Sequence, residues 1–163
     1  MNTLIKKTEE VDWKALKELR LESLKESPTA FGLSYSSMAE STDAQWQDRA
    51  ACRTPPSYFI AWNDSEAIGM IGGVINNDEY NLIAMWVSPN NRSLGIAKKL
   101  VEVVLGHAKE MGKSSVVLSV SPENAPAKIL YESMGFCFIK KFEYLDSHPH
   151  IQVQKMVVDL SIP

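Results

Sequence analysis

The sequence predicts a single α+β domain, built on one mixed, mostly antiparallel sheet with helices on both faces. Seven short apolar runs have the length of strands and are bounded by turn residues. Four other segments carry caps or apolar residues at helical spacing. A strand–helix–strand unit near residues 82–120 implies one parallel pairing inside an otherwise antiparallel sheet. Together these observations give the order β-α-α-β-β-β-α-β-α-β-β.

The first quarter of the chain predicts one strand and two helices. The strand is expected over residues 3–9, in "TLIKKTE". A helix should follow from the N-cap Asp12 to about Pro28, because aspartate is a favoured N-cap and proline interrupts a helix. The second helix is expected in "STDAQWQDRAAC", capped by Ser41 or Thr42.

Three strand-like runs follow, over residues 57–62, 67–75 and 82–88. Asn- and Asp-containing turns separate them, which predicts antiparallel hairpins. Gly72 and Gly73 lie in the middle run, where glycine weakens a strand. They indicate a bulge in that strand or a close approach of another group to its backbone.

The second half of the chain predicts two helices and three strands. A helix is expected over residues 95–111, before a nearly continuous apolar run at 114–120 that is typical of a buried central strand. Asn124 should cap a short helix. The last two strands are expected over residues 136–145 and 151–160.

Length and composition favour one cytoplasmic domain spanning residues 1–163. The formal net charge of −3 argues against a general nucleic-acid binder, which would have a basic surface. The two cysteines, Cys52 and Cys137, are too few for a disulfide framework and suit a reducing compartment. The N-terminus lacks the apolar segment of a signal peptide, and no apolar run is long enough to span a membrane. No constellation of metal ligands is apparent, so no metal is expected.

The stretch "VSPNNRSLGIAKKLV", residues 87–101, predicts an anion site at the start of a helix. The first N–H groups of a helix have no partner within it, and the helix dipole adds partial positive charge there, so phosphate binds well. Lys98 and Lys99 follow on the first turn. The alternative is a plain strand–helix connection with an exposed arginine. The residues expected to present successive amides are Arg92, Ser93, Leu94, Gly95, Ile96 and Ala97.

Two motifs in this order resemble the GNAT superfamily of N-acetyltransferases, and the resemblance covers most of the chain. The phosphate-binding motif of that family reads Q/R-x-x-G-x-G/A, and a later segment commonly reads N-x-x-A-x-x-x-Y-x-x-x-G-F. The first motif is matched by Arg92, Gly95 and Ala97, and the second by Asn124, Ala127, Tyr131, Gly135 and Phe136. Family members often carry glycine and then a basic residue after the arginine, where this chain has Ser93 and Leu94.

The resemblance implies an enzyme that transfers acetyl from acetyl-CoA to a primary amine of a small molecule or protein by direct attack, leaving CoA. It places Asn124 in the cofactor site with the phosphate-binding residues, Lys98 among them. It places Met85, Trp86 and Val87 along the pantetheine arm; the alternative for Met85 and Trp86 is packing in the core. The Val87 N–H is the expected donor to the thioester oxygen, and Tyr131 is the expected general acid for the leaving thiolate.

The base that would deprotonate the amine stays unassigned, because Asn81 stands where several family members place a glutamate. The candidates Asp78, Glu79, His148 and His150 each have an ordinary interpretation as surface residues. This absence keeps open a non-catalytic GNAT-fold module that binds acyl-CoA. The sequence also leaves open the transfer of an acyl group longer than acetyl. Family members often form dimers, so a homodimer is compatible with the sequence, which does not fix the oligomeric state.

Overall fold

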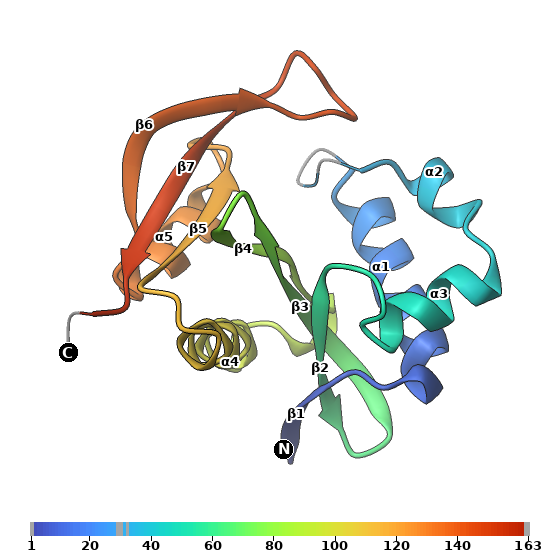
Figure 1. Ribbon diagram of the computed structural model, residues 1–163. Helices are drawn as coiled ribbons and strands as arrows, with labels where there is room; N and C mark the ends of the chain where they lie inside the picture. The colour runs from blue at the N-terminus through green and yellow to red at the C-terminus, as the bar shows by residue number, and fades with distance from the viewer. Residues whose placement is uncertain (1, 29–30, 32, 162–163) are drawn as a thin grey trace.

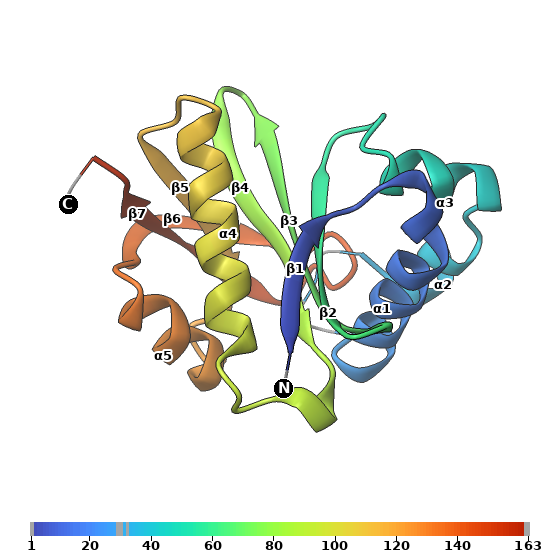
Figure 2. The ribbon, with the colours of Figure 1, turned by 90° about the horizontal axis from the view of Figure 1, so that it is seen from below.

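A computed structural model describes residues 2–28, 31 and 33–161 of the chain. A seven-stranded sheet in the order β1-β2-β3-β4-β5-β7-β6 runs through the molecule (Figures 1 and 2). The strands are β1 Thr3–Lys7, β2 Ser57–Asn63, β3 Glu66–Asn76, β4 Glu79–Val87, β5 Ser115–Val120, β6 Cys137–Tyr144 and β7 Gln152–Asp159. The predicted fold class is confirmed.

Helices cover both faces of the sheet, as predicted: α1 to α3 lie on one side and α4 and α5 on the other (Figure 2). The α-helices are α1 Trp13–Glu26, α2 Tyr35–Ala39, α3 Asp43–Ala50, α4 Ile96–Glu110 and α5 Ala125–Ser133. Two 3-10 turns, η1 Glu10–Asp12 and η2 Pro89–Asn91, precede α1 and α4.

Local capping explains most helix starts, including one helix that sequence reasoning missed. The unpredicted α2 is a short helix whose Ser34 cap accepts a hydrogen bond from the Ser37 N–H. Thr42 caps α3 as expected, in a reciprocal capping box with Gln45. The expectation for Asp12 was only half right. It occupies the N-cap position of α1, but its carboxylate accepts from the Glu9 N–H and so stabilises the preceding turn.

Each face of the sheet has its own hydrophobic core. Beneath α4, fully buried Leu100 and Val104 pack against the middle strands and the start of β6. On the other face, Trp46 of α3 and Leu16 of α1 pack on β2 to β4. Trp86, in β4, belongs to this second core. The middle strands are therefore buried on both sides, which explains their nearly continuous apolar sequences.

Strands β4 and β5 are parallel, as predicted, but only Asn81 and Val117 are paired between them. Strand β5 continues beside β7 over six antiparallel pairs, whereas β4 continues beside β3. Beyond Asn81 the two strands therefore part, and the C-terminal half of β4 is left with an unpaired edge inside the sheet. Figure 1 shows the two strands at the centre of the molecule.

A β-bulge bends β4 within this unpaired half. Met70 pairs with Trp86 and Gly72 with Ile83, so two residues of β4, Ala84 and Met85, face one residue of β3. Ala84 has φ 59°, a left-handed conformation that is uncommon for a residue with a Cβ. Strand β3 has a bulge of its own at Ile68, opposite Ala61 and Trp62 of β2. Beside Gly72, however, the bulge lies in the neighbouring strand, β4. It redirects the backbone where the strands part.

The predicted close approach at Gly73 is confirmed, and the approaching group is the Tyr80 ring. A Cβ on Gly73 would lie 2.0 Å from the Tyr80 hydroxyl oxygen. That hydroxyl is hydrogen-bonded to Nδ1 of His107 at 2.8 Å, which ties β4 to α4. Burial raises the pKa of Tyr80 to about 12. These contacts of Tyr80 therefore hold the start of β4 in place, next to the residue at which β4 is still paired with β5.

Gly73→Ala should destabilise the protein by about 1–3 kcal/mol, because the added methyl group displaces the buried Tyr80 ring and its bond to His107. Urea unfolding measures the change in the free energy of unfolding. Gly106→Ala is the matched control, since a Cβ there meets nothing within 4 Å and alanine favours helix by up to about 1 kcal/mol. Equal stability of the Gly73 variant and wild type would contradict the packing described.

Candidate functional site

A cavity of about 630 Å³ opens where β4 and β5 part. The ends of these strands, the start of α4 and the inner face of α5 line it. The predicted site residues that line this cavity are Met85, Trp86, Val87, Arg92, Ser93, Ala97, Asn124 and Tyr131. Segments that lie far apart in the sequence, from Glu26 to Tyr131, thus meet around one space. We call it the strand-gap cavity.

Four other predicted residues lie at or just before the start of α4 but do not line the cavity. Ile96 is buried in the core, whereas Leu94 and Lys98 are exposed to solvent. Gly95 occupies the N-cap position with φ 79° and offers no side chain to cap the helix. The opening N–H groups of α4 consequently have no side-chain acceptor among the described residues, and they remain available to an anion.

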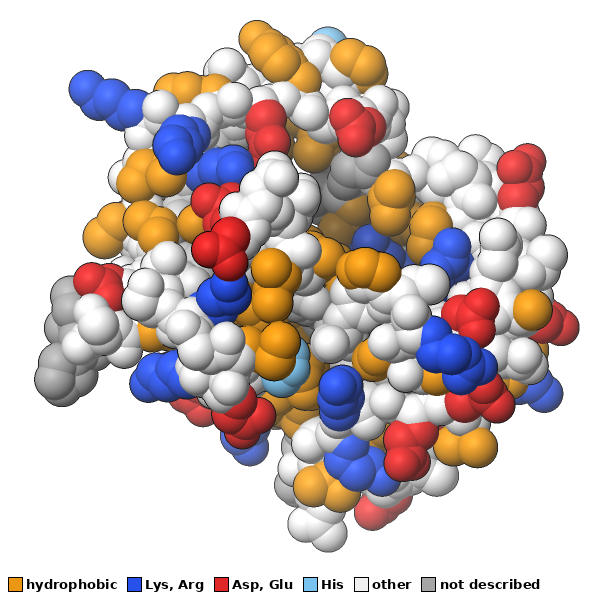
Figure 3. Space-filling view, viewed as in Figure 1, with side chains coloured by type: hydrophobic (Ala, Val, Ile, Leu, Met, Phe, Trp, Pro, Cys, Tyr) orange, Lys and Arg blue, Asp and Glu red, His pale blue; other side chains and the backbone are white. Residues whose placement is uncertain are grey.

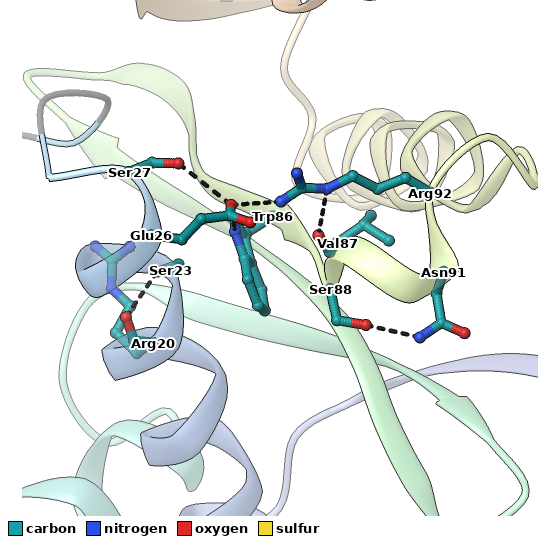
Figure 4. A network of polar contacts seen from close by, with 9 residues as sticks. All are labelled: Arg20, Ser23, Glu26, Ser27, Trp86, Val87, Ser88, Asn91 and Arg92. Atoms are coloured by element: carbon teal, nitrogen blue, oxygen red, sulfur yellow. Dashed lines mark hydrogen bonds and ion pairs between the residues drawn. The ribbon is translucent and has the colours of Figure 1, made fainter.

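The Arg92 side chain fastens the end of β4 to helix α1. Its Nε donates to the Val87 carbonyl at 2.9 Å, and its Nη2 donates to Oε1 of Glu26 at 2.5 Å (Figure 4). The guanidinium also lies 5.9 Å from the Trp86 ring centre. Sequence reasoning expected this charge to reinforce an anion site. In the structure it is paired with a carboxylate, and its main contacts are within the protein.

Glu26 is the counterpart that sequence reasoning missed. Its Oε1 accepts hydrogen bonds from Arg92 and, at 2.9 Å, from the indole Nε1 of Trp86 (Figure 4). The bond from Arg92 is the main reason that the pKa of Glu26 lies below its ordinary value. Sixty residues separate Glu26 from Trp86, and an acidic residue in a helical segment gives no local signal of such a contact.

The backbone of Val87 faces the gap between the strands. Ser88 donates to the Ile68 carbonyl and Met70 pairs with Trp86, so Val87 and Gly69 form a pair without mutual hydrogen bonds. At such a position the N–H and C=O point away from the neighbouring strand. The Val87 carbonyl accepts from Arg92, and its N–H is directed away from β3 on the unpaired side of β4.

Helix α5 brings Asn124 and Tyr131 to the same cavity. Asn124 caps this helix as predicted, its Oδ1 accepting from the Ala127 N–H at 3.4 Å. Tyr131 is 6% exposed and packs edge-on against Phe136. Its hydroxyl has no hydrogen-bond partner within residues 2–28, 31 and 33–161. Burial raises the pKa of Tyr131 above the ordinary value, so the phenol stays protonated at neutral pH.

A second cavity, of about 740 Å³, adjoins the strand-gap cavity. Both are lined by Leu82, Ile83, Ala84 and Ser119, and therefore meet at the bulge in β4 and the facing residue of β5. Figure 3 shows a hollow between the β6–β7 arm and the helical side of the molecule. The charged residues that line this adjoining cavity are Arg20, Glu79, Glu143, Asp146 and Lys155.

Of the four candidate bases, only Glu79 lines either cavity, and Lys155 lies 3.3 Å from its carboxylate. Asp78 pairs with Lys113 outside both cavities. His148 and His150 stack edge to face in the loop before β7 and line neither cavity.

Glu143, which sequence reasoning did not single out, lines the adjoining cavity and accepts a hydrogen bond from Ser119 Oγ at 2.5 Å. In the sequence, Glu143 is one of several charged residues in a strand that mixes polar and apolar residues. Only the sheet order β5-β7-β6 shows that its side chain lies near Ser119 of β5.

The described part of the chain holds no group of three or more His, Cys, Asp or Glu side chains arranged to bind a metal ion. Within the same residues, no helix has the length and apolar character needed to cross a membrane.

Comparison with known proteins identifies the class of fold and site. The model of the acetyltransferase (GNAT) family matches residues 13–136, a range that includes β4, α4, β5 and the whole of α5. The chain belongs to the GNAT acetyltransferase family. The resemblance noted from the two motifs is thereby confirmed.

Relatives and structural neighbours agree with this assignment. Human N-acetyltransferase 8 is 30% identical over 105 residues, which cover 61% of this chain and 44% of the human protein. A putative acetyltransferase from Salmonella typhimurium, solved with its cofactor acetyl-CoA, superposes with a TM-score of 0.76 at 15% identity, over 98% of this chain and 95% of that one. An N-acetyltransferase from Thermoplasma acidophilum in complex with coenzyme A gives 0.73 at 20% identity, over 98% and 99%. The chain thus spans under half the length of the human relative but matches the two solved folds almost end to end.

Glu26→Gln should lower the free energy of unfolding at pH 7 by about 1 kcal/mol, because it weakens the bonds to Arg92 and Trp86. A depressed pKa contributes stability above the unfolded value of about 4.5, and the contribution disappears as pH falls through the folded-state pKa. The difference from wild type should therefore narrow below about pH 4.5, measured by urea unfolding across pH. Glu22→Gln, on an exposed position of the same helix, is the control. A difference that does not change with pH would contradict the charged contact.

Proposed function

We propose that the protein is an acetyl-CoA-dependent N-acetyltransferase that acts on a primary amine of a small molecule or protein. The observation that carries the proposal is the strand-gap cavity itself. Around one space it combines an unpaired strand edge, the uncapped start of a helix and the protonated phenol of Tyr131. Membership of the GNAT family and the relatives named as N-acetyltransferases support the same reaction.

The chain's own groups fit the chemical parts of acetyl-CoA. The free N–H groups at the start of α4 suit a pyrophosphate. The unpaired edge at Met85, Trp86 and Val87 suits the amides of a pantetheine arm, which would complete the hydrogen bonding that β5 leaves open. Acetyl-CoA supplies an activated acetyl thioester. Arg92 contributes by holding the end of β4 in place through Val87 and Glu26.

Three groups of the protein would serve the transfer. The amine enters through the adjoining cavity, loses a proton and attacks the thioester carbon, after which the carbon–sulfur bond breaks. Glu143 is the general base that accepts the proton from the amine, because its hydrogen-bond partner Ser119 lines both cavities. The Val87 N–H stabilises the negative charge that develops on the thioester oxygen. Tyr131 gives its proton to the departing sulfur and regains one from water.

The competing function is a GNAT-fold module that binds acyl-CoA without catalysis. It is favoured by Asn81, which occupies the β4 position of a family glutamate and donates its amide to the Glu79 carbonyl at 3.0 Å. A thiol-release assay with acetyl-CoA across a panel of amines separates the two functions. Binding of acetyl-CoA without release of thiol on any amine would favour the module. A cytoplasmic location and a homodimer stay predictions from the sequence.

Acetyl-CoA should raise the melting temperature, because it binds the folded state preferentially. At a hundred times its dissociation constant, the stabilisation should be about 2.7 kcal/mol. Titration calorimetry and thermal denaturation measure binding and stability in parallel. Desulfo-CoA without the acetyl group should still bind, since the pyrophosphate contacts at α4 are kept. No heat and no shift at millimolar acetyl-CoA would rule out the proposed cofactor.

Tyr131→Phe should lower turnover at least tenfold and leave acetyl-CoA affinity nearly unchanged, because the ring is kept while the proton donor is lost. General acid catalysis typically contributes about 10²–10⁴-fold. Steady-state kinetics on an acceptor found in the amine panel, together with calorimetry, separate the two effects. Tyr35→Phe is the control, since Tyr35 is 44% exposed and lines neither cavity. Wild-type turnover in the Tyr131 variant would refute this assignment.

A further inference from the structure

The wall of the adjoining cavity contains a buried cation without an anionic partner. Arg20, in the middle of α1, lines this cavity and is only 4% exposed. Its Nε and Nη1 atoms are buried and have no hydrogen-bond partner in the described part of the chain. No carboxylate among those residues lies within ion-pair distance of it. Figure 4 shows Arg20 on the same helix as Glu26, whose carboxylate is already bonded to Arg92 and Trp86.

Structural roles account poorly for this guanidinium. A buried charge is costly unless it is paired, and arginine cannot avoid the cost by losing its proton at neutral pH. Desolvation is the main reason that the pKa of Arg20 lies below its ordinary value; the nearby Tyr58 raises this pKa, and Arg49 lowers it. The Phe31 ring lies 5.4 Å from the guanidinium carbon, which is a favourable but modest contact. Among residues 2–28, 31 and 33–161, the Arg20 side chain forms no ion pair that would hold a helix or strand in place.

Three carboxylates and one further cation, Lys155, line the other walls of the cavity. Glu143 and Asp146 approach from the end of β6 and the loop after it. Glu79 belongs to β4, and its charge is matched by Lys155 at 3.3 Å. The cavity therefore has an unpaired cation on the α1 wall and unpaired carboxylates on the β6 wall. Such an arrangement complements a ligand that carries both charges.

We propose that the amine acceptor is a small zwitterion of the amino-acid type, whose carboxylate is bound by Arg20 in the adjoining cavity. This inference rests on the proposed acetyl transfer and narrows its acceptor. The guanidinium provides unused N–H donors whose planar geometry matches a carboxylate. The amino group of the same molecule then lies toward Ser119 and Glu143, where the two cavities meet. Arg20 acts as a specificity-determining residue and takes no part in proton transfer.

The first test compares acceptors that differ only in the carboxylate. Purified full-length protein is assayed for thiol release with α- and ω-amino acids, each paired with its C-terminal amide. The amino acids should have a kcat/KM at least about a hundredfold higher than their amides, because a site built around an ionic hydrogen bond rejects analogues that lack it. The amide has the larger fraction of free amine at neutral pH. A preference for the carboxylate therefore cannot come from amine ionisation.

The second test removes the cation. Arg20→Met should raise the KM for the amino-acid acceptor at least about thirtyfold, with little change for the amide and none in acetyl-CoA affinity. Its melting temperature should equal or exceed that of wild type, because an unpaired buried charge has been replaced by an apolar chain. Lys17→Met is the matched control on the same helix, since Lys17 lies outside both cavities. A structural role for Arg20 would instead lower the melting temperature and weaken both acceptors equally.

A binding measurement distinguishes failure of this inference from failure of the proposed function. The amino acids and their amides are added to wild type and Arg20→Met, and melting temperatures are recorded without acetyl-CoA. Stabilisation by amino acids alone, lost in the variant, supports the inference even if no amine is acetylated. Equal acetylation of acids and amides overturns the inference and leaves N-acetyl transfer standing. Absence of both carboxylate-dependent turnover and carboxylate-dependent stabilisation also overturns it.

Discussion

The parting of β4 from β5 after a single residue pair is the constraint on which the rest of the structure depends. A sheet interior normally satisfies every backbone N–H and C=O, and unpaired groups there are costly. Here β3 holds one strand and β7 holds the other, so the two can separate without the sheet coming apart. The gap creates both cavities and leaves an edge able to pair with an extended ligand. A change in the strands where β4 and β5 separate would therefore alter both the sheet and the two cavities.

The β4 strand is shaped and fixed by contacts on either side of the gap. At its start, the Tyr80 ring lies over Gly73 and bonds to His107 of α4. At its end, Arg92 joins the Val87 carbonyl to Glu26 of α1. Between them the bulge at Ala84 accepts a left-handed backbone conformation, which only well-determined surroundings maintain. Helices on opposite faces thus hold the two ends of one strand, and the strained segment lies where the cavities meet.

Patterns of neighbouring residues in the sequence predicted the fold and the helix starts beside the strand-gap cavity. They could not predict contacts between segments that are far apart in the sequence. The loop before α4 and the cap at Asn124 follow from spacing along the chain, and both were found where expected. Glu26, Arg20 and Glu143 look like ordinary charged residues in the sequence. Glu26 and Glu143 bind partners in distant segments, and the distant segments that the structure describes around Arg20 offer it no anion. The same reason explains the Arg92 side chain. Its place just before α4 was predicted, but its pairing with Glu26 required α1 to be placed beside β4.

Polar groups without partners in the described residues occur beside both cavities. The β4 edge and the first amides of α4 adjoin one cavity, and the Arg20 guanidinium lies in the wall of the other. The remaining buried atoms without partners in the described residues belong to Trp46 and Arg49, which stack on each other in α3. Arg49 adds positive potential near Arg20, as its effect on the Arg20 pKa indicates. Selection for stability alone would favour pairing or replacing these groups, so their persistence beside open space points to ligands that complete them.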